Sequence, residues 1–460
     1  MISTAASRSV ALVLLVLLVL LVPVVTGGTV VAQDTTRAGP LSLTAAVERA
    51  VDEHPSMGGA RAAQAEASAA AGEAGAARLP SLALNASAFR YDDPMLVFPL
   101  HGLEPGFVPP FDETLMQAGA TLSYTLFDGG ARGARIRRAR AEAEAADAGL
   151  GGAEQDLAIR VSGAYLEIVL QRQVLEAHDR RIAALEAERE RVRRFLDAGR
   201  GAEVDLLRAD AASAEAQAAR IRQATALRVA ERDLERFMGE PSGAISPARL
   251  STPELTDTGL PGRERLLALA EEANPEIQAA RRRLTAAEAA VSVARGARWP
   301  ELQVLGNFTE RGGAGGDYED EWSAGLRLSY PVYTGGAVGR RIERGQAARA
   351  GAEAEVRLAA LRAAEAVDRA LAAVHESRAR SVSLAAAVAG FAEVARVEKL
   401  RLDTGAGTQT DYLRAEADLL AARADLAAAR QAAVGARLQL ARATGELTLD
   451  WLQQNLEPLP

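Results

Sequence analysis

The chain has 460 residues, of which 4% are aromatic and none is cysteine. Its formal net charge of −8 argues against a nucleic-acid partner, because such partners are normally bound by a basic face. Without cysteine, neither disulfide bonds nor thiolate metal sites can form. Alanine supplies much of the apolar content, and it favours long, closely packed helices over a thick globular core.

Residues 1–32 have the pattern of a secretory signal. Arg8 gives a short positive region, an apolar run extends from Val10 to Val22, and residues 30–32 are small enough for cleavage. The apolar run is shorter than the roughly 20 residues that span a bilayer as a helix. We therefore expect a signal peptide over 1–32, with an N-terminal membrane anchor as the other interpretation.

An alanine-rich helix is expected over about 43–78, and a β-hairpin over 81–126. Within the hairpin, residues 117–124 alternate strictly between polar or small side chains and apolar side chains. A period of two indicates strands. Strands of about ten residues with one apolar face suit a transmembrane β-barrel. They also suit an ordinary half-buried hairpin, and the pattern alone does not separate the two.

A very long helix is expected over 131–198, which would extend about 100 Å at 1.5 Å per residue. Apolar residues fall on the a and d positions of a heptad, which indicates a left-handed coiled coil. They are Leu157, Val161, Ala164, Ile168, Leu175, Ile182, Leu185, Val192 and Leu196. Gln171, His178 and Arg189 interrupt the series.

A glycine-rich turn follows the long helix, and the chain makes the same turn a second time. The segment "FLDAGRGAEVDLLRA" begins at Phe195, and "RLDTGAGTQTDYLRA" begins 206 residues later at Arg401. The segments "YTLFDGG" from Tyr124 and "YPVYTGG" from Tyr330 are also 206 residues apart. Upstream the offset is 220, as between Pro55 and Pro275. The chain is therefore two copies of one unit.

The repeat sets the expected domain boundaries. The first copy covers 33–240 and includes a tip at 197–205 and a helix at 203–238. A linker at 241–262 and a tail at 447–460 lie outside the two copies. The second copy covers 263–446, with a hairpin at 301–333, a long helix at 337–402, a tip at 403–411 and a helix at 408–444. Its heptad positions are Val367, Ala370, Val374, Leu384, Val388, Phe391 and Leu402.

Four strands are too few to close a membrane barrel, since the smallest transmembrane barrels have eight. An open strand edge in lipid would leave backbone N–H and C=O groups unpaired, at several kcal/mol each. If the strands lie in a membrane, several chains must share one barrel. Two chains would supply eight strands and three would supply twelve, and the strand count does not choose between them.

The repeat, the two strand-to-helix signatures and the two turns together resemble the TolC-type outer membrane efflux channel family over nearly the whole mature chain. The resemblance implies a homotrimer with a shared 12-strand β-barrel in the outer membrane, and a tunnel of long antiparallel helices, an α-barrel, across the periplasm. It implies partnership with a periplasmic adaptor and an inner-membrane pump, in drug efflux or type I secretion. It implies no catalytic chemistry and no cofactor.

The resemblance also places the two turns at the periplasmic entrance of the tunnel, and it places the linker (241–262) and the tail (447–460) in an equatorial band around the middle of the tunnel. In the family, carboxylates just after the turn narrow this entrance, and the matching residues here are Asp205 and Asp411. Helix N-capping is the other interpretation of both. Family members often carry a second Asp three residues later in the inner tip, where this chain has Arg414. Arg414 is therefore expected to pair with Asp411 or Asp205.

Four glycines lie in the turns: Gly199, Gly201, Gly405 and Gly407. A tight reversal requires a positive φ, which glycine adopts at little cost. By resemblance, they also leave grooves into which adaptor hairpins dock. Both interpretations are kept.

Other functions have weak support. The glycine pair at Gly129 lacks the GxGxxG spacing of a phosphate-binding loop. The four histidines are scattered, with no metal-binding spacing. An enzyme therefore has no residue support. The heptads alone would also allow a structural coiled-coil protein of the periplasm or cell surface, but such a scaffold does not require two lipid-compatible hairpins.

Overall fold

The computed structural model describes residues 41–99, 106, 108–241, 243, 250–256, 259–316 and 318–458. The chain divides into two compact units. One holds Ala74–Arg135 and Val291–Glu343, and the other holds Gly39–Glu73, Ile136–Ala290 and Arg344–Pro460. Each unit draws on both sequence repeats, because each repeat contributes a β-hairpin to the first unit and helices to the second. The expected signal segment, 1–32, lies outside the described residues.

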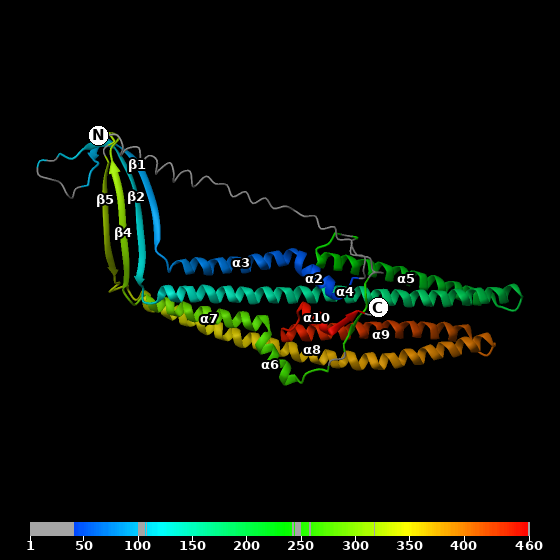
Figure 1. Cartoon of the computed structure of the whole chain (residues 1–460). Helices are drawn as coiled ribbons and strands as arrows, with labels where there is room; N and C mark the ends of the chain where they lie inside the picture. The colour runs from blue at the N-terminus through cyan, green and yellow to red at the C-terminus, as the bar shows by residue number, and fades with distance from the viewer. Residues whose placement is uncertain are drawn as a thin grey trace. The chain divides into compact units, whose positions relative to one another are not determined.

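The first unit is built on one antiparallel sheet with the order β1-β2-β4-β5 (Figure 1). Its strands are β1 (Ser81–Leu96), β2 (Phe111–Phe127), β4 (Glu301–Gly312) and β5 (Tyr318–Ser329). Both predicted hairpins are present, and β2 pairs with β4 to join the two repeats. The second hairpin ends earlier than the expected residue 333, because Pro331 has no N–H to donate to a ladder.

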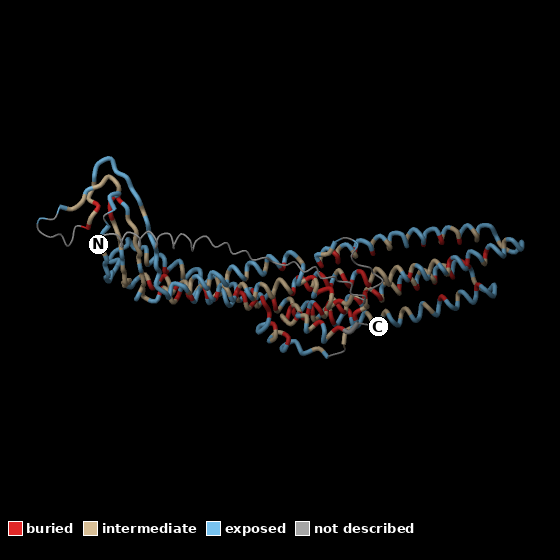
Figure 2. Tube along the Cα trace, turned by 45° about the horizontal axis from the view of Figure 1, so that its top comes forward, coloured by how far each residue is buried: buried red, intermediate tan, exposed pale blue. Residues whose placement is uncertain are grey.

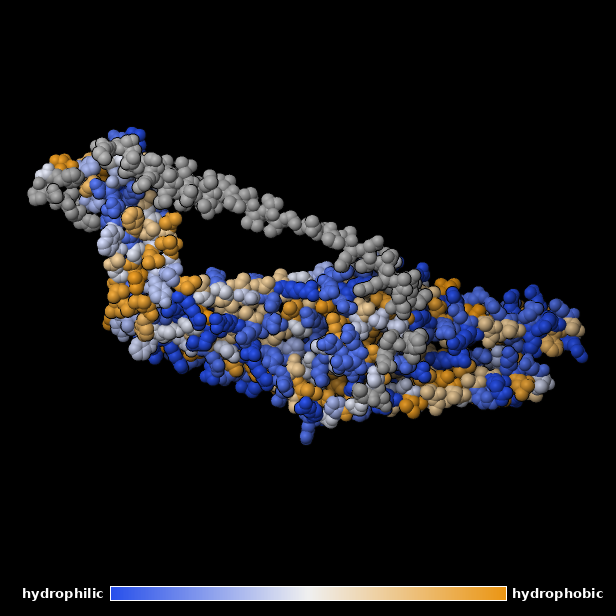
Figure 3. Space-filling model, viewed as in Figure 1, coloured by the Kyte–Doolittle hydropathy of each residue, from blue (hydrophilic) through white to orange (hydrophobic). Residues whose placement is uncertain are grey.

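The predicted alternation gives the sheet one apolar face. Leu84 lies opposite Ala120 in the ladder between β1 and β2, and Phe308 lies opposite Trp322 in the ladder between β4 and β5. Trp322 is 73% exposed. Figure 3 shows hydrophobic residues gathered over these strands. Within the described residues, no strand pairs with the outer edge of β1 or of β5.

Each repeat contains a long helical hairpin. The hairpins are α4 (Ala131–Asp197) with α5 (Glu203–Met238), and α8 (Ala337–Asp403) with α9 (Gln409–Thr444). All four helices begin and end within one residue of the positions expected from the sequence. Among the described residues, no helix is both long and apolar enough to cross a membrane.

The expected single helix before each β-hairpin is in fact two helices. The first repeat has α2 (Leu43–Glu53) and α3 (Pro55–Ala76), and the second has α6 (Arg263–Ala273) and α7 (Pro275–Gly296). His54 and Asn274 separate them in extended conformation, with ψ of 130° and 122°. The prediction of one continuous helix was wrong because a proline disfavours helical geometry in the residue before it. Each proline instead begins the next helix, where its missing N–H costs nothing.

The helical unit is most buried midway along its helices (Figure 2). Leu157, Val161 and Ile168 of the first heptad series are fully buried, together with Leu234 and Leu438 of the facing helices. Val367 begins the corresponding series in α8, and it is also fully buried. Phe391 departs from its heptad expectation, since it is 38% exposed.

The tail and part of the linker lie against this buried region. Strand β3 (Pro253–Leu255) pairs with β6 (Leu456–Pro458), and α10 (Leu449–Asn455) precedes β6. The Tyr165 hydroxyl lies 2.7 Å from the carbonyl oxygen of Leu41 and 2.6 Å from that of Ser251. It thereby ties α4 to the segments that cross it. Linker residues 242, 244–249 and 257–258 lie outside the described part of the chain.

Candidate functional site at the helical tips

The two long helices end in the same backbone turn. The Arg200 N–H donates to the Phe195 carbonyl at 2.9 Å, and the Ala406 N–H donates to the Arg401 carbonyl at 2.8 Å. Both are the six-to-one hydrogen bonds that close a helix C-terminus. The donors and acceptors are 206 residues apart, so the sequence repeat is a repeat of this turn.

The four tip glycines serve two different needs. Gly199 and Gly405 have φ of +68° and +75°, which glycine tolerates best. Gly201 and Gly407 do not have positive φ, so that part of the prediction was wrong. They are instead crowded: a Cβ on Gly407 would lie 2.9 Å from the Cβ of Arg401, and one on Gly201 would lie 3.0 Å from backbone of the preceding helix.

The second tip has a side-chain cap. The Thr408 Oγ1 accepts from the Asp411 N–H at 3.2 Å, and its hydroxyl donates to Asp411 Oδ2 at 2.7 Å. The N-cap is therefore Thr408, and Asp411 lies in the first turn, where a carboxylate favours the helix dipole. N-capping by Asp411 itself was the wrong interpretation. Its side chain stays exposed at the tip.

The first tip lacks such a cap. Ala202 occupies the N-cap position of α5 and makes no side-chain cap hydrogen bond. The Asp205 carboxylate accepts a hydrogen bond from Arg208 Nη1 at 3.4 Å, and Arg208 lies one turn along the same helix. Within the described part of one chain, Arg414 forms an ion pair with neither Asp411 nor Asp205. The two acidic residues thus have unequal surroundings, although they match in the repeat.

A buried polar cluster close to the second tip was missed by sequence reasoning. Tyr412 of α9 is only 2% exposed, and Glu188 of α4 is buried as well. Burial raises the pKa of the Tyr412 phenol well above its usual value, and the charges of Glu416, Glu188 and Asp403 raise it further. Tyr412 therefore stays neutral, with Glu416 as a hydrogen-bond partner.

Arg191 connects this cluster to the first tip electrostatically. Its Nη2 lies 2.7 Å from Glu188 Oε1. The hydrogen bond to Glu188 raises the pKa of the Arg191 guanidinium, and the charges of Asp403 and Asp205 act in the same direction. One signal could have found this cluster: Glu188 and Arg191 are polar where the second repeat carries valine, 206 residues on.

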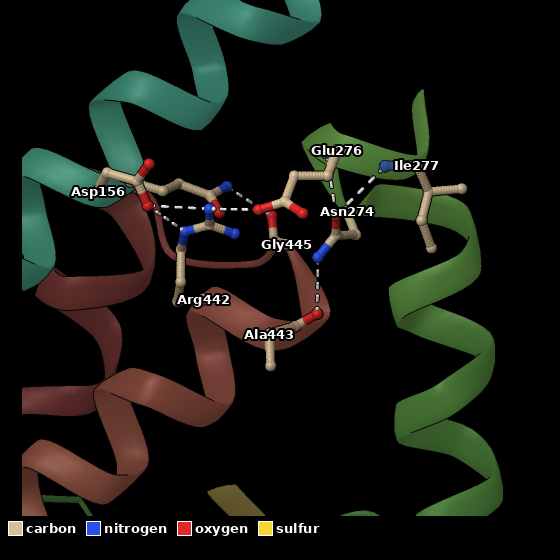
Figure 4. A network of polar contacts seen from close by, with 8 residues as sticks. Asp156, Asn274, Glu276, Ile277, Arg442, Ala443 and Gly445 are labelled. Atoms are coloured by element: carbon tan, nitrogen blue, oxygen red, sulfur yellow. Dashed lines mark hydrogen bonds and ion pairs between the residues drawn. The ribbon is translucent and has the colours of Figure 1, made fainter. Parts of the chain in front are cut away.

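A second polar network joins the two repeats midway along the helical unit (Figure 4). Arg442 Nε donates to Asp156 Oδ1 at 2.9 Å, and Arg442 Nη2 lies 3.3 Å from Glu276 Oε1. Asn274, which separates α6 from α7, accepts from the Glu276 N–H at 2.9 Å and donates to the Ala443 carbonyl at 3.0 Å. We call these contacts the Arg442 network. It fixes α4, α7 and α9 together.

The family model for outer membrane efflux proteins matches residues 46–240 and 266–446. The two matched segments correspond to the two repeats, each with a hairpin of strands and a hairpin of long helices. The chain belongs to the outer membrane efflux protein family.

Relatives and solved structures agree with this membership. Protein CyaE of Bordetella pertussis is 30% identical over 71% of this chain and 70% of its own length. The outer membrane efflux protein BepC of Brucella suis is 25% identical over 76% and 77%. The fold is similar to that of the outer membrane protein VceC of Vibrio cholerae, with a TM-score of 0.74, 21% identity and coverage of 88% of this chain and 96% of that one.

This efflux-family chain is an outer membrane exit duct of an efflux or secretion system. It is a passive channel component of the outer membrane, with a tunnel in the periplasm, and not an enzyme. Its family membership implies interaction with adaptor proteins and inner-membrane pumps. The exposed apolar face of the sheet has no role in a purely structural coiled-coil protein, which was the other class that the heptads allowed.

Proposed function

We propose that three copies of the chain form one continuous tube, with a shared 12-strand barrel in the outer membrane. The observation that carries this proposal is the four-stranded sheet with unpaired outer edges on β1 and β5. In a bilayer, such edges must be paired. Edge β1 of one copy would pair with edge β5 of the next, and the apolar face would meet lipid.

The tips form the gate in this proposal. Three copies would bring three Asp411 side chains into a ring, and acidic rings concentrate negative potential in cation-selective pores. Asp205 and Arg414 would lie close to the same entrance. The exposed position of Asp411 supports this role, and its contact with Thr408 would hold the carboxylate in place.

The tips are also the proposed docking surface for the adaptor. The four glycines of the turns, Gly199, Gly201, Gly405 and Gly407, carry no side chain, and the exposed Gly199 and Gly405 offer accessible backbone to the hairpins of a periplasmic partner. Cargo choice is assigned to the pump and the adaptor.

Native mass tests the proposal. The protein would be extracted from outer membranes in mild detergent, and its mass would be measured by light scattering with correction for detergent. We expect three chain masses, and a species on SDS gels that converts to a single chain on heating. A monomer that stays soluble without detergent would overturn the proposal.

A further inference from the structure

The end of α7 packs against the start of α4 where the sheet gives way to helices. Helix α4 follows β2, and α7 precedes β4, which is the neighbour of β2 in the sheet. A Cβ on Gly296 of α7 would lie 2.7 Å from the Cβ of Ala131, and a Cβ on Gly129 would lie 2.6 Å from the Cβ of Trp299. The packing therefore requires glycine at both positions, and it gathers the side chains of the two helix ends in one place.

Four arginines lie at these helix ends, and we call them the Arg298 cluster. They are Arg132 and Arg135 at the start of α4, Arg295 at the end of α7, and Arg298 in the turn before β4. The carboxylate of Asp128 is already engaged, since its Oδ2 accepts from Arg135 Nη2 at 2.9 Å and from the Arg132 N–H. Within the described residues, Arg295 and Arg298 form no ion pair, and both are exposed. The cluster thus carries positive charge that its own chain leaves uncompensated.

Local structure gives no reason for this charge. The positive end of the helix dipole favours carboxylates in the first turn of a helix, yet the first turn of α4 contains no acidic residue. Glu301 begins β4, close to Arg298 in sequence, but its Oε1 accepts from Gln303 Nε2 at 2.8 Å. Positions that oppose a local preference are often functional, and here an external anion would supply the missing negative charge.

The cluster borders the apolar face of the sheet. Tyr124 is in register with Val304, and Val304 is in register with Leu326, so the three side chains share one face. The guanidinium carbon of Arg132 lies 5.5 Å from the centre of the Tyr124 ring, at the helical end of this face. Leu326 is 70% exposed and Trp299 is 60% exposed. Figure 3 shows hydrophilic residues directly next to the hydrophobic patch over the strands.

We propose that the Arg298 cluster binds the phosphate of an anionic phospholipid in the periplasmic leaflet of the outer membrane. The inference rests on the proposed function, which places the strands in the bilayer and their border with the helices at its periplasmic surface. Arg295 and Arg298 contact the phosphate, because a planar guanidinium suits paired hydrogen bonds to phosphate oxygens. Trp299 lies at the level of the headgroup, where tryptophan is enriched in membrane proteins.

The surroundings of the cluster favour a lipid over soluble phosphate. A lipid lays its acyl chains on the exposed apolar face near Leu326, whereas soluble phosphate leaves that face and Trp299 uncovered. They also favour a net negative headgroup. The ammonium group of phosphatidylethanolamine would be repelled by the uncompensated arginines, and phosphatidylglycerol carries no such group.

The sequence repeat does not duplicate the cluster. Arg295 corresponds to Gly75 at the offset of 220, and Arg132 corresponds to Val338 at the offset of 206. Half of the arginines are therefore replaced by uncharged residues in the other copy. The expected stoichiometry is one tightly bound anionic lipid per chain.

Native mass spectrometry of the whole protein tests the site. Protein extracted from outer membranes and freed of lipid would be titrated in detergent with phosphatidylglycerol or phosphatidylethanolamine of identical acyl chains. We expect one phosphatidylglycerol per chain at concentrations at which phosphatidylethanolamine is not retained. Arg295→Gln with Arg298→Gln should weaken phosphatidylglycerol binding about 25-fold, because each arginine near a lipid surface contributes about fivefold. Binding of phosphatidylethanolamine should change much less.

The matched control is Arg281→Gln with Arg283→Gln. It removes the same charge from exposed positions on α7, and Arg283 lies about 18 Å from Arg295 along the helix at 1.5 Å per residue. Phosphatidylglycerol binding should be unchanged in this control. An excess of inorganic phosphate should not displace the lipid, and displacement would assign the cluster to a soluble anion instead.

The same spectra report the number of chains in each variant. Equal binding of the two lipids by an intact oligomer, or an equal loss of binding in the test variant and the control, would overturn the lipid site and leave the proposed function standing. A single-chain mass for the natural protein would overturn the proposed function, and with it the membrane placement of this cluster.

Discussion

The two tips of the molecule have one backbone conformation and two chemical environments. Each turn has the same six-to-one hydrogen bond and a glycine with positive φ. The second tip adds the Thr408 cap and the buried Tyr412, whereas the first has Ala202 and the half-buried Leu206. The comparison shows that the repeat preserves the backbone turn, while the side chains around the turn differ between the two tips.

The largest expected effect comes from removing Tyr412. Tyr412→Ala empties a fully buried site, and large-to-small changes of aromatic core residues cost about 3–5 kcal/mol. Hydrogen exchange of the first α9 amides should accelerate strongly. The matched variant Leu206→Ala should accelerate exchange in α5 much less, since Leu206 is only half-buried in one chain. Equal acceleration at both tips would remove the distinction between them.

The hydroxyl group of Tyr412 can be tested separately. Tyr412→Phe keeps the ring and removes the hydrogen bond with the half-buried Glu416, at a cost of about 1.5–3 kcal/mol, as for other hydrogen bonds to charged groups. Hydrogen exchange in α9 should lie between that of the natural chain and that of Tyr412→Ala. An effect as large as that of the alanine variant would show that the ring contributes little.

The backbone should respond equally at both tips. Gly199→Ala and Gly405→Ala each place a Cβ at a positive φ, which costs about 1–2 kcal/mol. The amides of Arg200 and Ala406, which close the turns, should lose protection from exchange to the same degree. A large difference between the two variants would mean that the backbone turns are not equivalent.

Sequence patterns predicted the elements better than the contacts between them. The bounds of α4 and α9 follow from heptads and from the repeated turn, because local periodicity carries that information. The break at His54 was missed, although Pro55 was noted, because alanine-rich sequence on both sides favours one helix. Tyr412 was missed because its burial arises from tertiary packing, and because a charged group near it, Glu188, is far away in sequence and breaks the repeat.

The smallest effect should come from the cap. Thr408→Ala removes the side chain that accepts from the Asp411 N–H, and loss of an N-cap costs about 1 kcal/mol. Ala202→Thr should give the first tip a similar gain. Exchange rates of the first-turn amides of α9 and α5 would measure both changes. If Ala202→Thr leaves α5 unchanged, the two helix starts differ in backbone as well as in side chains.

Single-channel conductance in planar bilayers tests the central claim most directly, namely that the chain forms a passive duct whose entrance is narrowed at the second tip. Asp411→Ala is predicted to raise conductance and to weaken blockade by multivalent cations, and Asp205→Ala is predicted to change both less. Unchanged conductance together with unchanged cation blockade in Asp411→Ala would contradict the account.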